Sequence, residues 1–231
     1  MIKVASYNIR KALGTDRRRA PERIIGILSE IDADIVALQE ADRRFGVRHR
    51  VLPPAMLAEA GWHEVPVATH PASMGWHGNA LLVRPSIAIT SAARITLPAV
   101  EPRGAISADL RLPGGAAIRV VAAHLDLSGI RRRQQARAIL ADLGRRRPLP
   151  TLVLGDFNEW QGPLGCLHLF AAGFAQAPTE ASFPARRPVA RLDRIMASRA
   201  LRVGQCGVHR SPAARIASDH LPIWAVIEGA G

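Results

Sequence analysis

Hydrophobic and polar positions alternate over residues 2–7, and this period of two predicts a β-strand that ends at Asn8. A helix should begin at Pro21, because proline suits the first turn and apolar residues then recur every three or four positions. The apolar side of this helix comprises Ile24, Ile27, Leu28 and Ile31. Residues 35–40 follow as a buried strand with a glutamate at its end, so the opening segment predicts a β-α-β unit.

The chain beyond residue 62 is dominated by strand patterns. Short apolar or alternating segments predict strands at 65–69, 80–84, 87–97, 105–112, 117–125, 152–154, 192–196, 201–208 and 221–227. Pro113, Gly114 and Gly115 are turn-forming residues between two of these segments. They predict a tight hairpin connection there.

A second long helix is expected after Ser128, a residue type that suits a helix N-cap. Gly144 fits the C-terminal end of that helix. Its inner face is predicted to carry Ile130, Ala136, Ile139, Leu140 and Leu143. Most of its arginines are expected on the solvated outer face; these are Arg131, Arg132, Arg133 and Arg137.

Many strands with a few helices predict an α/β (α+β) fold in which two packed, mostly antiparallel sheets carry helices on their outer faces. A length of 231 residues suits one domain spanning 1–231. The longest apolar runs are too short to cross a bilayer, and the N-terminus enters a strand pattern directly instead of a leader pattern. We therefore expect a cytoplasmic protein without stable membrane insertion. Cys166 and Cys206 lack metal-ligand spacing and are expected to be free thiols.

The net charge of +12 favours anionic partners such as nucleic acid, lipid headgroups or small phosphorylated molecules. Lys3 and Lys11 are the only lysines among 31 cationic residues, so nearly all of the positive charge is arginine. This preference fits either selection for phosphate binding or the coding composition of a GC-rich genome. The charge alone therefore does not select a substrate.

Polar and ionisable residues recur where the predicted buried strands begin or end. They are Asn8, Glu40, His124, Asp126, Asp156, Asn158, Asp193, Asp219 and His220. Such groups are costly beside an apolar core unless they are paired or bound to something. Carboxylates and amides supply the oxygen ligands that Mg²⁺ or Mn²⁺ prefers, and histidines transfer protons near neutral pH. This inventory matches metal-dependent hydrolysis of phosphate esters.

The order of seven short motifs resembles that of the endonuclease/exonuclease/phosphatase superfamily, to which deoxyribonuclease I belongs. These motifs are Tyr7-Asn8-Ile9-Arg10, Leu38-Gln39-Glu40, Gly78-Asn79-Ala80-Leu81-Leu82, His124-Leu125, Gly155-Asp156-Phe157-Asn158, Leu192-Asp193-Arg194-Ile195 and Ser218-Asp219-His220-Leu221-Pro222. The resemblance covers essentially the whole chain, and compact bacterial members are the most similar in pattern. It implies a four-layer α/β/β/α sandwich.

The resemblance also implies a Mg²⁺ cofactor, with Mn²⁺ as a substitute. Glu40 is then the principal metal ligand, Asn8 a neighbour of metal or phosphate, and Asp219 a supporting or second-metal ligand. The same motifs predict substrate contacts at Arg10, His77 and Asn79.

The catalytic residues implied by the resemblance come from four of these motifs. Asp156 and Asn158 would lie around the nucleophile and the phosphate, and His220 would be an acid/base held by Asp193. His124 would donate to the phosphate or the departing oxygen. Its acidic partner stays open, because Glu64 is poorly placed in the sequence and Asp126 could equally be a loop cap.

These observations predict a metal-dependent phosphoester hydrolase of EC class 3.1 that uses an activated water, most consistent with a phosphodiesterase or nuclease. The alternatives are a phosphatase or a phospholipid-headgroup phosphodiesterase, followed by a non-catalytic module that binds polyanions. Nucleic acid is one candidate among the anionic phosphoester substrates. The aromatic content of 4% argues mildly against single-stranded nucleic acid, because few side chains are available for stacking. We expect a monomer.

Overall fold

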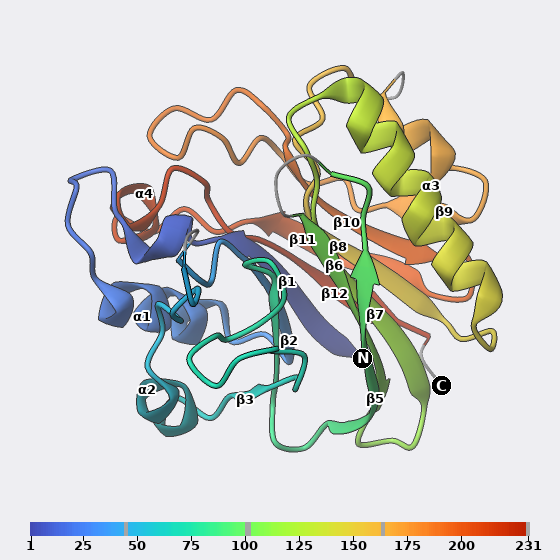
Figure 1. The fold of residues 1–231 in the computed structure, drawn as a ribbon, viewed down its shortest axis with the longest axis horizontal. Coiled ribbons are helices and arrows are strands. Elements are labelled where there is room, and N and C mark those ends of the chain that lie inside the picture. Colours follow the sequence, from blue (N-terminus) through green and yellow to red (C-terminus); the bar gives the residue numbers. More distant parts are fainter. Residues whose placement is uncertain (44–45, 100–102, 163–164, 230–231) are drawn as a thin grey trace.

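A computed structural model describes residues 1–43, 46–99, 103–162 and 165–229. Over these residues the chain forms two six-stranded sheets that lie face to face, with helices against their outer surfaces (Figure 1). The first sheet has the strand order β11-β12-β1-β2-β4-β3 and the second β5-β6-β7-β8-β10-β9. Each sheet is mixed, with one parallel pair among antiparallel neighbours.

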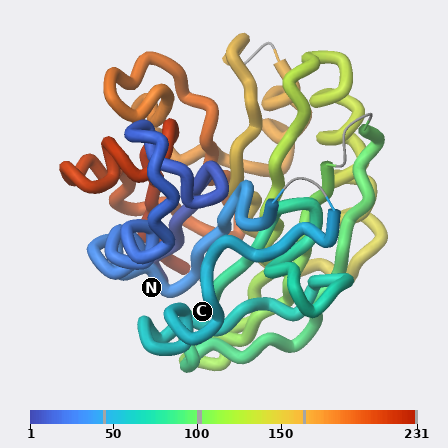
Figure 2. Tube along the Cα trace, turned by 60° about the vertical axis from the view of Figure 1, so that its left-hand side comes forward, coloured from blue at the N-terminus to red at the C-terminus, as the bar shows by residue number. Residues whose placement is uncertain are grey.

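The first sheet combines strands from both ends of the chain. Its strands are β1 (Ile2–Asn8), β2 (Ile35–Gln39), β3 (His63–Glu64), β4 (Ala80–Val83), β11 (Arg202–Val208) and β12 (Ile223–Glu228). Its outer side carries η1 (Arg10–Ala12), α1 (Pro21–Ile31), α2 (Pro54–Glu59) and α4 (Ala214–Ala217). Because β1 pairs with β12, Ile2 lies opposite Ile227, and the two ends of the chain lie close together (Figure 2).

The second sheet is built from the middle of the chain. Its strands are β5 (Ala88–Thr96), β6 (Gly104–Arg111), β7 (Ala117–His124), β8 (Thr151–Asp156), β9 (Phe174–Gln176) and β10 (Asp193–Ser198). Helix α3 (Gly129–Arg145) covers its outer face together with the short η3 (Cys166–Leu169).

Three apolar clusters hold these layers together. The central cluster lies between the sheets and includes Val4, Ile106 and Leu154. A second cluster packs the first sheet against α1, and a third packs the second sheet against α3 and η3. Each side of each sheet is therefore buried, which explains why most central strands read as continuous apolar runs. The predicted four-layer α/β/β/α sandwich is confirmed.

The two parallel strand pairs place their carboxyl ends at one edge of the sandwich. In the first sheet β1 and β2 are parallel with Asn8 opposite Gln39, and α1 connects them. In the second sheet β7 and β8 are parallel with His124 opposite Asp156, and α3 connects them. Ligand sites in α/β folds commonly form beyond the carboxyl ends of such strands. The polar strand ends of the sequence thus converge from two β-α-β units.

Most predicted elements are present, but the predicted strand at 65–69 is wrong. The observed strand nearby is the two-residue β3, and residues 65–69 are irregular. Pro66 has no N–H to donate to a neighbouring strand, so the segment cannot continue a ladder. Val65 and Val67 nevertheless point into the central core, which is why their apolar pattern resembled that of a strand.

Helix α3 differs from its prediction in two side chains. Ile130 was expected on the inner face but is 66% exposed, whereas Arg132 is buried. The helix also passes through Gly144 and ends at Arg145. Ser128 is at the N-cap as expected, without a side-chain cap hydrogen bond. Among the described helices, none combines the length and apolarity needed to cross a membrane.

Candidate active site

The side chain of Asn8 joins the two sheets at the edge where the parallel pairs end. Its Nδ2 donates a hydrogen bond of 3.0 Å to Oδ2 of Asp156, at the end of β8. Its Oδ1 accepts a bond of 3.1 Å from the N–H of Arg10. Both Asn8 and Asp156 are buried, so this amide fixes the carboxylate relative to the first sheet.

His220 and Asp193 form a buried hydrogen-bonded pair beside Asp156. Nδ1 of His220 lies 2.9 Å from Oδ2 of Asp193, and the hydroxyl of Ser182 donates to that same oxygen. The other ring nitrogen, Nε2, lies 3.7 Å from Oδ2 of Asp156. Asp193 begins β10 directly opposite Asp156, so strand register places the two carboxylates side by side. The pair therefore orients one imidazole nitrogen toward the centre of the site.

His124 approaches the same carboxylate from the end of β7. Its Nε2 lies 3.4 Å from Oδ2 of Asp156, so two histidines and one amide surround that oxygen. Asp126 does not pair with His124, since its Oδ1 accepts the N–H of Ser128 at 2.9 Å, as a loop cap does. Glu64 is bound to Arg50 instead. Of the candidates, only Asp156 has the contact expected of an acidic partner.

The two histidines have opposite electrostatic environments. Burial alone would lower the pKa of His220, but the carboxylates of Asp193 and Asp156 raise it to about 10. Burial lowers the pKa of His124 to about 3, because the attraction of Asp156 is weaker than this effect and Arg103, His220 and Lys11 also disfavour a second positive charge. In this arrangement His220 is the cation, with a proton to give, and His124 is the neutral imidazole, which keeps one N–H that can donate a hydrogen bond.

The loop after β8 is fixed by its own side chains. Oδ1 of Asp156 accepts the N–H of Asn158 at 2.9 Å, and Nδ2 of Asn158 donates to the carbonyl of Leu125 at 2.9 Å. Asn158 has a φ of 48°, a left-handed conformation that asparagine tolerates better than most residues. Residues 156 and 158 therefore lie together beside the segment of His124 and Leu125.

Glu40 lies at the end of β2, where the ammonium group of Lys11 pairs with its Oε2. The side chain of Glu40 is 27% exposed, so the carboxylate is only partly withdrawn from solvent. Lys11 also lies near enough to His124 to help lower the pKa of that imidazole. The positive charge of Lys11 therefore acts both on Glu40, through an ion pair, and on the imidazole of His124.

Asp219 is connected to the end of β1 through Arg10 and Ser218. Its Oδ2 is 3.4 Å from Nε of Arg10, and its Oδ1 is 3.3 Å from the hydroxyl of Ser218. That hydroxyl donates to the carbonyl of Asn8 at 2.7 Å and accepts the N–H of His220 at 3.3 Å. The Ser-Asp-His segment is thereby attached to the end of β1.

The other two predicted substrate-binding residues, His77 and Asn79, lie in different surroundings. Nδ1 of His77 lies 2.8 Å from the guanidinium of Arg48, and its ring packs against Trp76 at a centroid distance of 4.0 Å. Asn79 is fully buried, and its Nδ2 donates to the carbonyl of Gly104 at 2.8 Å. Asn79 therefore connects the two sheets. Its amide nitrogen is bonded to a backbone carbonyl and is not directed at a substrate.

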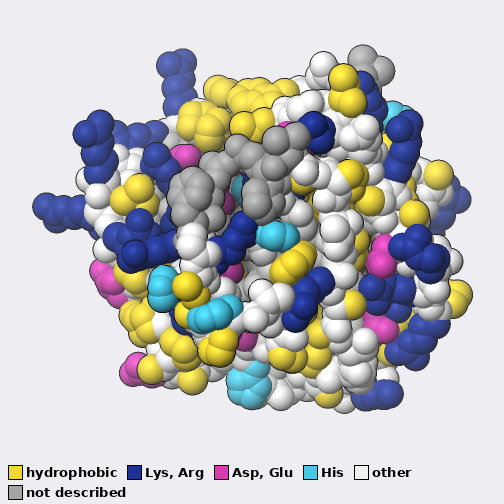
Figure 3. Space-filling model, in the orientation of Figure 1, with side chains coloured by type: hydrophobic (Ala, Val, Ile, Leu, Met, Phe, Trp, Pro, Cys, Tyr) yellow, Lys and Arg dark blue, Asp and Glu magenta, His cyan; other side chains and the backbone are white. Residues whose placement is uncertain are grey.

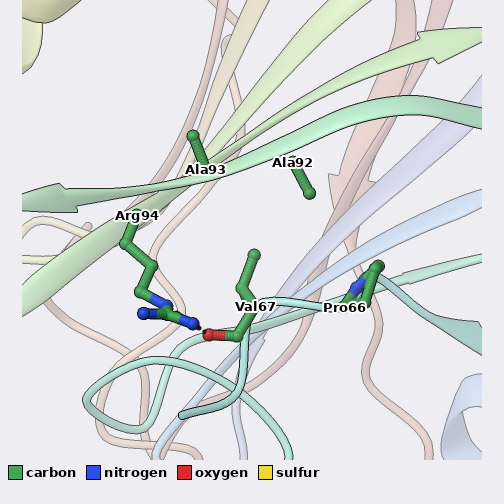
Figure 4. A pocket seen from close by; sticks show the side chains of 5 residues that line it. All are labelled: Pro66, Val67, Ala92, Ala93 and Arg94. Carbon is green, nitrogen blue, oxygen red and sulfur yellow. Dashed lines mark hydrogen bonds between the residues drawn. The ribbon is translucent and has the colours of Figure 1, made fainter.

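Figure 3 shows one face of the molecule, in the orientation of Figure 1. Lys and Arg side chains are spread over this face, and several His side chains lie near its centre. A hollow of about 190 Å³ is lined by Pro66, Val67, Ala92, Ala93 and Arg94. There Arg94 points toward the carbonyl of Val67 and donates to it at 2.7 Å (Figure 4). Its lining offers one charged group, which is already bonded, so it is a poor candidate for a second reactive centre.

The sequence of residues 5–220 matches the model of the Endonuclease/Exonuclease/phosphatase family. The chain belongs to this family. The protein YbhP of Escherichia coli K12 is 31% identical to it, over 97% of this chain and 95% of YbhP. Members of the family are generally hydrolases of phosphoesters and typically depend on a divalent metal.

Solved structures of other proteins have a similar fold. A mannosyl-6-phosphatase from Bacteroides thetaiotaomicron matches with a TM-score of 0.74 and 21% identity, over 98% of this chain and 99% of that one. The TDP2 protein of D. rerio, complexed with a single-strand DNA product, matches with a TM-score of 0.72 and 16% identity. That likeness covers 98% of each chain.

The residues of this family member fit a divalent cation by their chemistry. An ammonium group already pairs with Glu40, so that position attracts positive charge, and Oδ1 of Asp193 is buried without a hydrogen-bond partner. Among the described residues, Asp156, Asp193 and His220 have ligand atoms within 4.8 Å of one another. This trio differs from the predicted ligands Glu40, Asn8 and Asp219. Its closeness follows from the Asp193–His220 hydrogen bond and the strand register.

Sequence reasoning missed three side chains that shape the site. The hydroxyl of Ser182 supports Asp193, and the ring of Phe183 lies against His220 at a centroid distance of 4.8 Å. Both come from an irregular segment in which no motif marks them. Glu159 is the third: it follows Asn158 directly, is 1% exposed and pairs with Arg132. In the sequence, the signal that could have identified Glu159 was its position directly after the Gly155-Asp156-Phe157-Asn158 motif.

Proposed function

We propose that this protein is a Mg²⁺- or Mn²⁺-dependent phosphoester hydrolase, in the first instance a phosphodiesterase, that uses water as the nucleophile. The observation that carries the proposal is the buried Asp193–His220 pair, whose free imidazole nitrogen faces Asp156. A carboxylate, two histidines and two asparagines then surround one point at the sheet edge. Hydrolysis of a phosphoester needs these roles: orientation of water, proton transfer and stabilisation of charge.

In the proposed mechanism Glu40, Asn8 and Asp219 would hold the metal, which would neutralise charge on the phosphate. Asp156 accepts a hydrogen bond from a water molecule and orients it, while Asn8 keeps the carboxylate in place. His220 gives the proton on Nε2 to the oxygen whose bond to phosphorus breaks, and Asp193 fixes its ring through Nδ1, while the attacking water passes its own proton to Asp156 as it bonds to phosphorus. Asn158 and His124 donate to nonbridging or departing oxygens.

The surplus of positive charge supports an anionic substrate without selecting one. The net charge of +12 favours any polyanion. The two structural relatives described above differ in what they are named for, a sugar phosphate and a DNA product, so the shared fold supports the phosphoester class alone. Phosphatase and phospholipid-headgroup activity are the second candidates. A non-catalytic polyanion-binding role is less well supported, because each predicted catalytic side chain is retained.

A turnover screen tests the proposal. Wild type and His220→Ala are compared on an aryl phosphodiester, an aryl phosphomonoester, supercoiled DNA and a phospholipid extract, with Mg²⁺, Mn²⁺ or EDTA. We expect metal-dependent hydrolysis of a diester, lost with EDTA and reduced at least ~10³-fold in the variant. Hydrolysis of the monoester alone would favour the phosphatase alternative. If both proteins bind DNA equally and neither turns over any substrate, the binding-module alternative replaces the proposal.

A further inference from the structure

Trp160 is the one exposed aromatic side chain among the described residues, with 61% of its surface accessible. Exposing an indole forfeits the favourable burial of a large apolar surface, and tryptophan rings are enriched at interfaces, where one end is apolar and the other is wet. Trp160 follows Asn158 by two residues, and so lies on the loop that carries the proposed catalytic asparagine.

A chain of ring contacts connects Trp160 to the reactive centre. Its ring lies edge-on to Phe183, with a centroid distance of 6.1 Å and an interplanar angle of 86°. The ring of Phe183 then lies 4.8 Å from that of His220. The rings of Trp160 and Phe183 thus form a continuous aromatic connection from the surface to His220.

The loop holds Trp160 in place on both sides. Asn158 is bonded to the carbonyl of Leu125, and buried Glu159 accepts the N–H of Gln161 at 3.0 Å. Glu159 also accepts the N–H of Cys166 at 2.7 Å, which attaches the loop to the next element. A fixed aromatic surface loses little conformational entropy when a ligand stacks on it. The exposed ring is thus preorganised.

We infer that Trp160 and Phe183 form a stacking subsite for one planar aromatic ring on the His220-side substituent of the substrate, such as a nucleobase or aryl group of a small phosphodiester. A single exposed ring suits one ring of a ligand, whereas proteins that bind single strands stack successive bases on several aromatic side chains. An aryl or nucleoside phosphodiester carries both parts, since its phosphate supplies the charge for the proposed centre and its ring supplies the planar apolar surface for Trp160. This inference rests on the proposed function for the location of phosphate.

The first test compares kcat/KM for an aryl phosphodiester with that for a dialkyl phosphodiester of similar size. The ratio should fall about tenfold in Trp160→Ala, since loss of one stacking partner costs roughly this much. Trp160→Phe should recover most of the ratio, whereas Trp160→Leu, apolar but not aromatic, should not. The effect should fall on KM rather than kcat. An unchanged ratio in Trp160→Ala, or full recovery with leucine, would overturn the stacking subsite.

A second measurement is independent of turnover. With EDTA present, a nitroaryl phosphonate should quench the fluorescence of wild type, and the quenching should be largely lost in Trp160→Phe, which retains Trp62, Trp76 and Trp224. An alkyl phosphonate should not quench. Quenching in a protein that lacks hydrolytic activity would support the subsite while refuting the proposed function. Hydrolysis of aryl esters with equal quenching in both proteins would refute the subsite alone.

Discussion

The buried pair between Arg132 and Glu159 leads to a sharp prediction about stability. Two nitrogens of the Arg132 guanidinium reach the Glu159 carboxylate, at 3.1 and 3.4 Å, and its Nη1 donates to the carbonyl of Leu127 at 2.6 Å. The two side chains are 5% and 0% exposed. Removal of one member of such a pair leaves an uncompensated charge away from water, which costs about 3–5 kcal/mol.

The Glu159 carboxylate makes the unfolding free energy depend on pH, and the direction of its pKa shift gives the sign of that dependence. Burial alone would raise the pKa of Glu159, but the N–H groups of Gln161 and Cys166 and the guanidinium of Arg132 lower it from 4.5 to about 2. A group with a lowered folded-state pKa stabilises the protein above its unfolded pKa and loses that effect as pH falls toward the folded value. At about 1.4 kcal/mol per pKa unit, the loss between pH 4.5 and 2 amounts to about 3 kcal/mol.

The assay is urea unfolding of wild type, Arg132→Met and Arg137→Met, followed by circular dichroism between pH 7 and pH 2.5. Methionine retains most of the aliphatic length of arginine, and Arg137 lies exposed on the same helix, so that variant is a matched control. At pH 7 Arg132→Met should lose about 3–5 kcal/mol of unfolding free energy, and Arg137→Met less than about 0.5 kcal/mol. The further loss of unfolding free energy in acid should be smaller in Arg132→Met than in wild type. Without the guanidinium, fewer contacts favour the charged form of Glu159, so burial keeps the folded-state pKa of Glu159 closer to its unfolded value.

Two results would refute this reasoning. Equal stability of Arg132→Met and Arg137→Met at pH 7 would show that the ion pair is hydrated or replaced by other contacts. An acid-induced loss in Arg132→Met as large as that in wild type would show that Arg132 does not set the pKa of Glu159.

Three further predictions concern the site itself. Glu40→Gln should abolish metal-dependent turnover and weaken Mg²⁺ binding in calorimetry, yet change the unfolding free energy by no more than about 1–2 kcal/mol, because the carboxylate is partly exposed; general unfolding would instead make Glu40 structural. Lys11→Met should tighten Mg²⁺ binding up to about fivefold, because it removes a partly exposed ammonium competitor from Glu40, and weaker binding would contradict that competition. Asp193→Asn and His220→Ala should each reduce turnover at least ~10³-fold, and the double variant should be far less than additive; full additivity would separate the two residues.

The residue pattern was sufficient to predict the local elements whose sequence carries a clear period. Helix α1 begins at Pro21 and buries the predicted stripe because both features depend on near neighbours in the sequence. The pattern was insufficient at residues 65–69 and at Ile130, where burial depends on what packs against the segment. Val65 is buried although it is not part of a strand. The facing sheet covers its side chain, and this burial does not depend on the backbone hydrogen bonds of the segment.

For the candidate site, too, the sequence predicted some features and the tertiary structure decided others. Motif order predicted the membership of Asn8, Asp156, His124 and His220, because groups of this kind at the ends of apolar strands need partners. The resemblance also implied that Asp193 holds His220, as the 2.9 Å contact between them has it, but the sequence left open which carboxylate faces His124. Strand register decided that Asp156 lies opposite both His124 and Asp193, and Asp126 remained a loop cap.

The sequence by itself thus determined the fold family, the helices and strands with strong periods, and the residue types available for chemistry. The tertiary structure alone decided that Arg132 turns inward to Glu159 and that Phe183 and Ser182 reach the Asp193–His220 pair. The physical reason is that periodicity and capping act between residues a few positions apart. Ion pairs and ring contacts depend instead on two sheets whose strands come from distant parts of the chain.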